Sequence, residues 1–583
     1  YELLGRIHID RGRSEAAVEA YMRAISLGSK SFEAHNNLGN ALLQMERFND
    51  AIDAYEKALQ IKPYDEAVLS NIALVFSQPN LEPEVHSPRI QSVILKILAQ
   101  PNIIRPKDIC RFSLKLLILD PKISFGIKNV GHCEDQSLLI EILRKLTDTP
   151  LFIQLMKIVP LPNLKFEQLL KKIRSILLLD ISKNLELPKI DEFLVALASQ
   201  CFVNEYIYDV SEKEAFGVSQ LKANIEARLR ANEELALEEL LTLACYEPLH
   251  QHFEETYFAE KSEMREIVLQ QILEPREEME IKCKIRSLSP ATQNTSIKVR
   301  AQYEQHPYPK WVNTRLFTEP CSLSELACAL NLKIEMNQAL LTQKPNVLIA
   351  GCGTGQQAIV AASRYKDAKI VAVDLSLSSL GYAQRKSIEL GMTNIEYIHG
   401  DILELNRLGR EFDLIESIGV LHHLEDPLHG WEILSNCLIE GGLMKIGLYS
   451  NLARRDITKT RSELSQSTLD ITKKDLISFR ESLINSELSH HQSLLRSSDF
   501  YSLSSFRDLI LHVQETQFTI PQIRTALSEL GLAFCGFEFS ALNYHHSGDS
   551  SSPTLSSFDL WERFETVNPD TFSEMYQFWC QRI

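Results

Sequence analysis

Residues 346–360 read NVLIAGCGTGQQAIV, in which a short apolar run leads into three alternating glycines and then into a helix-forming segment. This is the pattern of a buried strand, a tight turn and a helix. Glycines in such a turn let the backbone approach a ligand closely, and the first turn of the helix points its N–H groups at that ligand. The pattern predicts an α/β domain with a nucleotide-type site at Gly351, Gly353 and Gly355.

A second apolar run, Ile370 to Val373, ends in Asp374, which lies 19 residues after Gly355. A carboxylate at this place can accept hydrogen bonds from both ribose hydroxyls of a nucleoside. Dinucleotides and S-adenosylmethionine both satisfy this requirement. The glycines follow the spacing G-x-G-x-G, and Gln356 stands where a dinucleotide fingerprint has its third glycine, so the spacing does not support pyrophosphate binding.

Further strands are predicted at Ile395 to Ile398, Phe412 to Glu416 and Leu443 to Leu448. Gly400-Asp401-Ile402 follows the first of them, and Ser417-Ile418-Gly419-Val420-Leu421-His422-His423-Leu424 follows the second. With the glycine loop and the acidic strand end, these motifs make residues 345–450 resemble the class I S-adenosylmethionine-dependent methyltransferases.

The resemblance implies a Rossmann-like fold with a mostly parallel sheet and S-adenosylmethionine as cofactor. By position, it implies that Gly351, Gly353 and Gly355 line the methionine part of the cofactor and that Asp374 holds the ribose. It also implies that Asp401, with the backbone of Ile402, meets the adenine amino group, and that Ser417 lies beside the cofactor.

No fixed catalytic group is required by this chemistry, because a sulfonium methyl is already activated and the protein has mainly to align the reactants. A general base matters only where the acceptor atom carries a proton, and His422 and His423 are the candidates. The alternative is that they only pack or are solvated, as the pairs His490-His491 and His545-His546 also recur without an evident site. None of the pairs shows an i, i+4 partner or a nearby carboxylate in the sequence, so no metal site is expected.

The segment from Tyr303 to Trp311, YEQHPYPKW, is rich in aromatic residues and proline. It resembles the segment that precedes the catalytic domain in some bacterial tetratricopeptide-repeat methyltransferases. Two prolines within three residues favour a stiff, extended chain. We expect either a strap over the cofactor with Tyr308 in contact with it, or a rigid linker that packs Trp311 into the core.

An internal repeat precedes these motifs, since Leu38-Gly39, Ala51, Tyr55 and Ala58 match Leu4-Gly5, Ala17, Tyr21 and Ala24 at a spacing of 34 residues. Small residues would let two antiparallel helices approach closely, with Tyr55 behind them. The segment resembles the tetratricopeptide repeat. Because such arrays need about three repeats, we expect further repeats before Tyr1. The region is expected to be either a docking groove for a protein or peptide partner or a plain helical scaffold.

Helical periodicity continues through the middle of the chain, where no strand pattern or ligand-spaced cluster is visible. The predicted division is repeat helices at 1–80, a helical middle region at 81–300 and a methyltransferase domain at 301–546 with a helical insertion at about 451–518. Residues 547–583 are expected to form a flexible stretch and a docking helix with Phe572, Met575, Tyr576 and Trp579 on one face. The insertion is expected to shape the acceptor site.

The composition of the chain limits the classes of partner and the cellular location that we expect. With 61 basic and 77 acidic residues, the net charge of -16 disfavours nucleic acid. The sequence contains no run of about 18 apolar residues, which a membrane-spanning helix would need. The scattered cysteines favour a reducing cytoplasm. We therefore expect a cytoplasmic methyltransferase with an unknown acceptor. The alternatives are a repeat scaffold whose methyltransferase-like domain binds cofactor without activity, and an NAD-dependent oxidoreductase.

Overall fold

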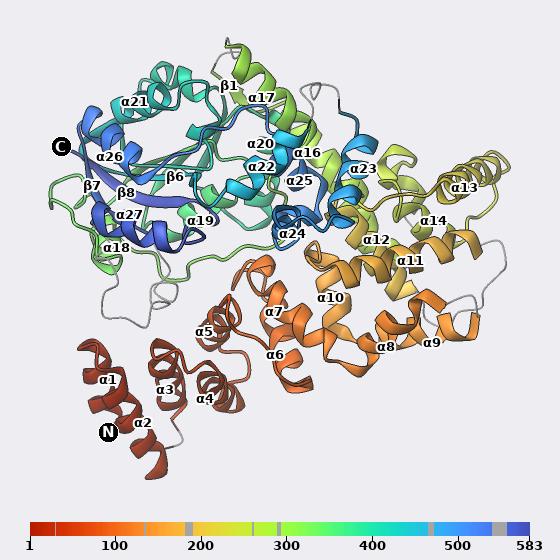
Figure 1. The fold of residues 1–583 in the computed structure, drawn as a ribbon, viewed down its shortest axis with the longest axis horizontal. Coiled ribbons are helices and arrows are strands. Elements are labelled where there is room, and N and C mark those ends of the chain that lie inside the picture. Colours follow the sequence, from red (N-terminus) through yellow and green to blue (C-terminus); the bar gives the residue numbers. More distant parts are fainter. Residues whose placement is uncertain are drawn as a thin grey trace.

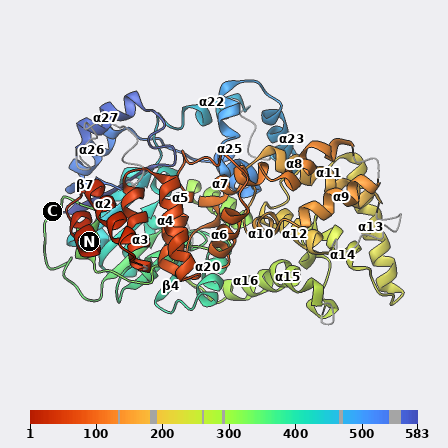
Figure 2. The same cartoon turned by 90° about the horizontal axis from the view of Figure 1, so that it is seen from below.

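The computed structural model describes residues 1–29, 31–132, 136–180, 191–258, 262–288, 293–464, 471–538 and 557–583. An all-helical amino-terminal part forms an arc around one side of an α/β part (Figure 1, and seen from below in Figure 2). Within the described ranges no helix is long and apolar enough to cross a membrane. The predicted fold class, helical repeats followed by a Rossmann-like domain, is confirmed.

The repeat region consists of α1 (Glu2–Asp10), α2 (Ser14–Ser26), α3 (Phe32–Gln44), α4 (Phe48–Ile61) and α5 (Glu66–Phe76). The small residues allow close helix packing, as predicted. A Cβ built on Gly39 would lie 2.5 Å from the Tyr55 ring, and one on Gly5 would lie 2.7 Å from the Tyr21 ring. Both tyrosines are fully buried behind these glycines.

Short helices continue the arc, and four of them begin with a proline, whose missing N–H is no loss in a first helical turn. They are α6 (Pro88–Leu98), α7 (Pro106–Ile118), α8 (Pro121–Asn129), α9 (Gln136–Thr147), α10 (Pro150–Ile158), α11 (Leu164–Asp180), α12 (Asp191–Val203), α13 (Glu212–Arg230), α14 (Leu237–Ala244), α15 (Arg265–Val268) and α16 (Glu274–Lys282). One hydrophobic cluster runs from Ala17 in α2 to Ile272, so the repeat helices and the middle helices share a core.

The sheet of the α/β part has eight strands in the order β1-β4-β3-β2-β5-β6-β8-β7, and only β8 runs antiparallel to its neighbours. Its strands are β1 (Arg286–Ser287), β2 (Asn346–Ala350), β3 (Lys369–Asp374), β4 (Ile395–His399), β5 (Phe412–Ile418), β6 (Leu438–Leu448), β7 (Leu532–Phe537) and β8 (Tyr576–Arg582). The strand predicted before the glycine loop is β2, and the four strands predicted after the loop are β3, β4, β5 and β6. All five are confirmed. β1 lies in the segment where no strand was expected.

Both faces of the sheet are covered, as a parallel sheet requires. Leu348 and Ala350 of β2 belong to one apolar cluster and Val347 and Ile349 to another, because successive side chains point to opposite faces. The first cluster includes α21 (Pro427–Cys437), α26 (Ile520–Glu529) and α27 (Phe558–Val567), and the second includes α18 (Leu323–Ala329), α19 (Gln356–Arg364) and α20 (Leu377–Glu389). In the sequence, α17 (Asn294–Gln305) lies between β1 and α18.

The insertion after β6 is helical, with α22 (Arg455–Glu463), α23 (Lys473–Ile484), α24 (Ser489–Leu494) and α25 (Leu503–Leu511). Its apolar side chains, among them Leu476, Phe500 and Phe506, join the cluster of the helical part. Figure 1 shows these helices between the sheet and the arc. The insertion therefore fastens the α/β part to the helical part.

The expected docking helix at the carboxy terminus is wrong. Tyr576 and Trp579 lie in β8, which pairs with β6 and β7, and α27 comes before it. The apolar spacing in this segment fits a helix, but Tyr576, Phe578 and Cys580 also alternate along a strand and are fully buried. The predicted flexible stretch from Ser547 to Pro553 lies outside the described residues.

Candidate functional site

The glycine loop joins β2 to α19 with three left-handed residues, at φ 77° for Gly351, 52° for Gly353 and 80° for Gly355. Side chains are excluded there by close neighbours as well as by backbone conformation. A Cβ on Gly351 would lie 2.4 Å from Val420, one on Gly353 2.8 Å from the Tyr308 carbonyl oxygen, and one on Gly355 2.5 Å from Ala383. The loop is thus a bare backbone cradle at the carboxyl edge of the sheet.

Asp374 lies beside this cradle, at the end of the neighbouring strand. Its Oδ2 accepts a hydrogen bond from the Gly353 N–H at 2.7 Å, and its Oδ1 accepts one from the Ser376 N–H at 2.9 Å. Burial raises the pKa of the carboxyl to about 6, against the effect of these two hydrogen bonds. The structure therefore brings the predicted ribose-binding residue and the glycine loop into direct contact.

Asp401 and Ile402 follow β4 and are both buried. The Asp401 carboxylate accepts a hydrogen bond from the Leu403 N–H at 3.0 Å and caps the short helix Ile402–Leu408. The Gly400 N–H donates to the Asp374 carbonyl oxygen at 2.9 Å, which ties the ends of β3 and β4 together. These residues lie on the same edge of the sheet as the glycine loop.

Ser417 ends β5 and is fully buried, and its hydroxyl has no hydrogen-bond partner among the residues that the structure describes. A buried hydroxyl without a partner is costly, so such an atom commonly indicates a missing ligand or water. A polar ligand in the glycine cradle would be suitably placed to satisfy it. This orphaned hydroxyl and the bare backbone of the loop fit the cofactor that the sequence predicts.

The strap from Tyr303 to Trp311 crosses the glycine loop. The Thr354 hydroxyl donates to the Pro309 carbonyl oxygen, and the Trp311 indole Nε1–H donates to the Thr354 carbonyl oxygen at 3.2 Å. Trp311 is buried, and its carbonyl oxygen accepts from the Tyr382 hydroxyl. The segment therefore passes over the loop at Tyr308 and anchors Trp311 in the core, while contact between Tyr308 and a cofactor stays a prediction.

Glu205 of the helical part holds this strap and the insertion together. Its Oε1 lies 3.2 Å from Lys310 Nζ, and its Oε2 accepts a hydrogen bond from the Ser504 N–H at 2.6 Å. Tyr303, at the other end of the strap, donates to Asp508 of α25. Three segments far apart in the sequence thus meet over the carboxyl edge of the sheet.

His422 and His423 lie in a short helix after β5, Leu421–His423, and both are buried. Neither ring nitrogen of His422 has a partner among the described residues, and its ring packs on Tyr449 with centroids 3.9 Å apart. His423 Nδ1 lies 2.8 Å from the Gln514 carbonyl oxygen, so the neutral ring carries its proton on Nδ1 and its lone pair on Nε2. Burial lowers the pKa of His423 to about 3.

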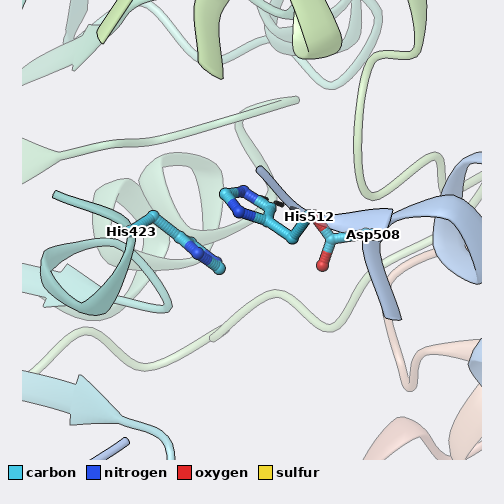
Figure 3. Close-up of side chains that lie close together, drawn as sticks. All are labelled: His423, Asp508 and His512. Atoms are coloured by element: carbon cyan, nitrogen blue, oxygen red, sulfur yellow. Dashed lines mark ion pairs between the residues drawn. The ribbon is translucent and has the colours of Figure 1, made fainter. Parts of the chain in front are cut away.

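His423 meets two residues that sequence reasoning missed (Figure 3). Its ring stacks on that of His512 with centroids 3.5 Å apart, and His512 Nε2 lies 4.0 Å from Asp508 Oδ1. Asp508 and His512 stand four residues apart at the end of α25, a helical spacing that could have drawn attention to them. Their convergence with His423 depends on how the insertion packs.

A hydrogen-bond chain fixes the orientation of these groups. The Gln514 N–H donates to His512 Nδ1 at 3.2 Å, so the neutral ring carries its proton on Nε2. His512 Nε2 lies 3.0 Å from the Tyr303 hydroxyl, which donates to Asp508 Oδ1 at 2.8 Å.

Two adjacent arginines, Arg454 and Arg455, lie at the start of the insertion, where free guanidinium groups could meet an anionic acceptor. Arg454 is buried, and its Nε and Nη2 each donate to Glu515 at 2.8 Å. Arg461 donates to the same carboxylate at 2.7 Å. Arg455 is half exposed and pairs with Asp570 at 2.9 Å. Both arginines of the pair are therefore already bound to carboxylates.

A surface hollow lined by Asn346, Lys369 and Glu396 lies at the amino-terminal ends of β2, β3 and β4. This is the edge of the sheet opposite the glycine loop. Ligands of open α/β sheets bind at the carboxyl ends of the strands. We therefore assign the functional site to the glycine loop.

Comparison with known proteins agrees with this assignment. Residues 347–442 match the family described as a methyltransferase domain, and residues 32–65 and 5–46 match tetratricopeptide repeat families. The predicted methyltransferase domain and repeats are thereby confirmed. This family is S-adenosylmethionine-dependent, which confirms the predicted cofactor at the level of the family.

The similar curated proteins match only parts of the chain. A trans-aconitate 2-methyltransferase of Deinococcus radiodurans is 30% identical over 131 residues, which are 22% of this chain and 48% of that protein. An uncharacterised protein of Synechococcus is 26% identical over 236 residues, 38% of this chain and 57% of that protein. The chain thus spans about half the length of these relatives. Among solved structures, PKMT2 from Rickettsia typhi in complex with AdoHcy is 17% identical with a TM-score of 0.34, covering 47% of this chain and 55% of that one.

Proposed function

We propose that this chain transfers a methyl group from S-adenosylmethionine to an acceptor that binds between the carboxyl edge of the sheet and the helical insertion. The observation that carries the proposal is the contact between the Gly353 N–H and the Asp374 carboxylate. It joins a bare backbone loop to a carboxylate at adjoining strand ends, as a nucleoside-bearing cofactor requires.

For the cofactor, we assign the methionine part to Gly351, Gly353 and Gly355 and the ribose to Asp374. Asp401 and the backbone of Ile402 would hold the adenine, Ser417 would contribute its unpaired hydroxyl, and Tyr308 would close the site from the strap. When bound, the cofactor supplies an electrophilic methyl group on a positively charged sulfur. The strap and the insertion exclude water from the reacting atoms and align the acceptor.

For the acceptor, we assign His423 as the group that orients it. His422 is less suited, because its ring is fully buried against Tyr449. The lone pair on His423 Nε2 can accept a hydrogen bond from an acceptor N–H or O–H, while the Gln514 carbonyl holds the ring in place. A ring with a pKa of about 3 stays neutral at physiological pH, so it serves as a hydrogen-bond acceptor more than as a strong base.

We further propose that α1 to α5 recruit a protein or peptide partner, on the ground of the confirmed repeats. The described cysteines are all unpaired, which supports a cytoplasmic location. The second candidate function is a repeat scaffold with a cofactor-binding but inactive domain. It is favoured by the pairing of Arg454 with Glu515, which leaves neither of these two charges free for an acceptor.

Calorimetry with S-adenosylmethionine, S-adenosylhomocysteine and NAD tests the cofactor. We expect the first two to bind and NAD to give no heat, and binding of NAD alone would overturn the assignment. Transfer of a labelled methyl group into fractions of a cell extract tests the reaction. Label in one fraction supports methyl transfer, whereas cofactor binding without label in any fraction favours the scaffold.

A further inference from the structure

A second cluster of ligand-type side chains lies within the insertion, away from the glycine loop. Glu463 ends α22, and His490 and His491 begin α24. His490 Nε2 lies 2.6 Å from Glu463 Oε1, and His491 Nε2 lies 2.7 Å from Glu463 Oε2. The expectation that no carboxylate lies near this histidine pair is therefore wrong. We call these three residues the Glu463 cluster.

We propose that the Glu463 cluster is a binding site for Zn²⁺. Two imidazole nitrogens and one carboxylate form a donor set that zinc uses in proteins, with the remaining position taken by water. All ligand atoms lie within 4.8 Å of one another. His490 and His491 are 4% and 9% exposed, whereas Glu463 is 38% exposed, so the site is held by buried rings and opens to solvent on the carboxylate side.

The surroundings of His491 support this assignment. Its Nδ1 lies 2.8 Å from the Ser486 hydroxyl oxygen, so the ring can donate the Nδ1 proton there and present the lone pair of Nε2 to a metal. Ligating histidines in metalloproteins commonly make such an outer hydrogen bond, which fixes both tautomer and ring orientation. Ser486 is in turn held by the Leu488 N–H, which donates to its hydroxyl at 3.2 Å.

The other group of ligand-type side chains, His423, Asp508 and His512, is less suited to a metal although its ligand atoms also lie within 4.8 Å of one another. The Gln514 N–H points at His512 Nδ1, which places the proton on Nε2. Nε2 faces the Tyr303 hydroxyl, so the lone pair that a metal needs on this side is not available. Among the described residues, the ring nitrogens of the Glu463 cluster contact only side-chain oxygens.

Metal binding requires only a small movement. Bonds of about 2.0–2.2 Å in a tetrahedral zinc site separate neighbouring ligand atoms by about 3.3 Å. The nitrogens and oxygens of the Glu463 cluster are 2.6 and 2.7 Å apart. The exposed carboxylate can withdraw by this difference while the two buried rings stay in place. The ion would then link α22 to α24, so that the chain between Glu463 and His490 forms a closed loop.

The test uses the full chain, stripped with a chelator and then titrated with ZnCl₂ or CoCl₂. We expect one equivalent of zinc to be retained after gel filtration, the visible absorption of tetrahedral Co²⁺, and a rise in the unfolding temperature on zinc addition. Glu463→Gln and His490→Ala should abolish retention. Ser486→Ala should weaken zinc affinity by about tenfold to a hundredfold, as loss of an outer hydrogen bond does.

His429→Ala is the matched control, because His429 is an exposed histidine beside Glu432 on another helix, and it should retain the metal. Far-UV circular dichroism and the affinity for S-adenosylhomocysteine show whether each variant is folded. The proposal is overturned if the stripped chain retains no zinc. It is also overturned if folded Glu463→Gln and His490→Ala bind zinc as the unaltered chain does, or if His512→Ala abolishes retention instead.

Discussion

The carboxylate of Asp374 lies at the end of β3, with its two oxygens bound to the N–H groups of Gly353 and Ser376. Ionised, it holds the glycine loop and can accept from ribose hydroxyls, but burial opposes the charge and raises its pKa to about 6. A residue suited to bind a nucleoside thus carries a cost in stability. Function and folding make opposite demands at this position.

Asp374→Asn separates the two demands. A carboxyl whose pKa is raised on folding contributes stability that is present below pH of about 4 and is lost as the pH rises through about 6. As the pH rises from 4.5 to 7.5, the free energy of unfolding of the variant should therefore increase by about 1–3 kcal/mol relative to that of the unaltered chain. Urea unfolding at the two pH values measures this change. Cofactor affinity at pH 7.5 should fall about tenfold or more, and unchanged affinity would mean that the ribose binds elsewhere.

His423→Ala tests the acceptor side. We expect kcat to fall about tenfold, the cost of one lost hydrogen bond, with the affinity for S-adenosylhomocysteine unchanged. Because the pKa of His423 is about 3, its ring stays neutral from pH 5 to 8 and adds no acid limb to the rate profile in that range. His429→Ala, at an exposed position, serves as the control. An unaltered kcat in the His423 variant would exclude this role.

Among elements, the strap has the most direct contact with the glycine loop. In Gly353→Ala a Cβ would meet the Tyr308 carbonyl oxygen at 2.8 Å and should displace the strap. Gly409 has a similar φ of 59° and no atom within 4 Å of a built Cβ, so Gly409→Ala shares only the backbone strain of about 1–2 kcal/mol. We expect cofactor affinity, measured by calorimetry, to fall at least about tenfold in the first variant alone. Equal affinities in the two variants would show that the strap does not close the site.

The insertion is fastened to α11 by a buried ion pair. Arg480 Nη1 and Nη2 each donate to Glu167 at 2.7 Å, and both side chains are almost fully buried. Glu167→Gln leaves the buried guanidinium without its counter-charge and should cost about 3–5 kcal/mol in free energy of unfolding. The double variant Glu167→Leu with Arg480→Met should cost less than Glu167→Gln. Arg230→Ala removes an exposed pair and should change stability by less than about 0.5 kcal/mol. Urea unfolding of all three distinguishes the pair from surface charge.

Helices and strands could be predicted from the sequence where the residues that determine them lie close together in the chain. The apolar run before Gly351 and the carboxylate at Asp374 lie within single strand ends, so their placement followed directly. β8 was missed because Phe572, Met575, Tyr576 and Trp579 fit a helical spacing, whereas a strand at this place is set by pairing with β6 and β7. The meeting of Tyr303, Asp508 and His512 was also missed, because it depends on packing between distant segments.

At the scale of the whole molecule, the helical part and the insertion share one core. Apolar residues of α2 to α15 and of the insertion helices α23 to α25 belong to a single cluster, and Glu205 links the strap, the helical part and α25. The proposed acceptor side would therefore be built by the helical part as much as by the sheet. The glycine loop and Asp374, proposed for the cofactor side, lie at strand ends of the sheet and are covered by the strap.

This division predicts different effects for two deletions. Replacing residues 451–518 by a short linker removes Asp508 and His512 and exposes the core that α23 and α25 cover, so transfer should be abolished and a hydrophobic dye should bind. Cofactor affinity should stay within a few-fold, because the glycine loop and Asp374 are retained. Removing residues 1–62 deletes only α1 to α4 and should leave both cofactor affinity and the integrity of the insertion unchanged. Labelled transfer into extract distinguishes the two, with calorimetry as the check on cofactor binding, and transfer that survives loss of the insertion would place the acceptor elsewhere on the molecule.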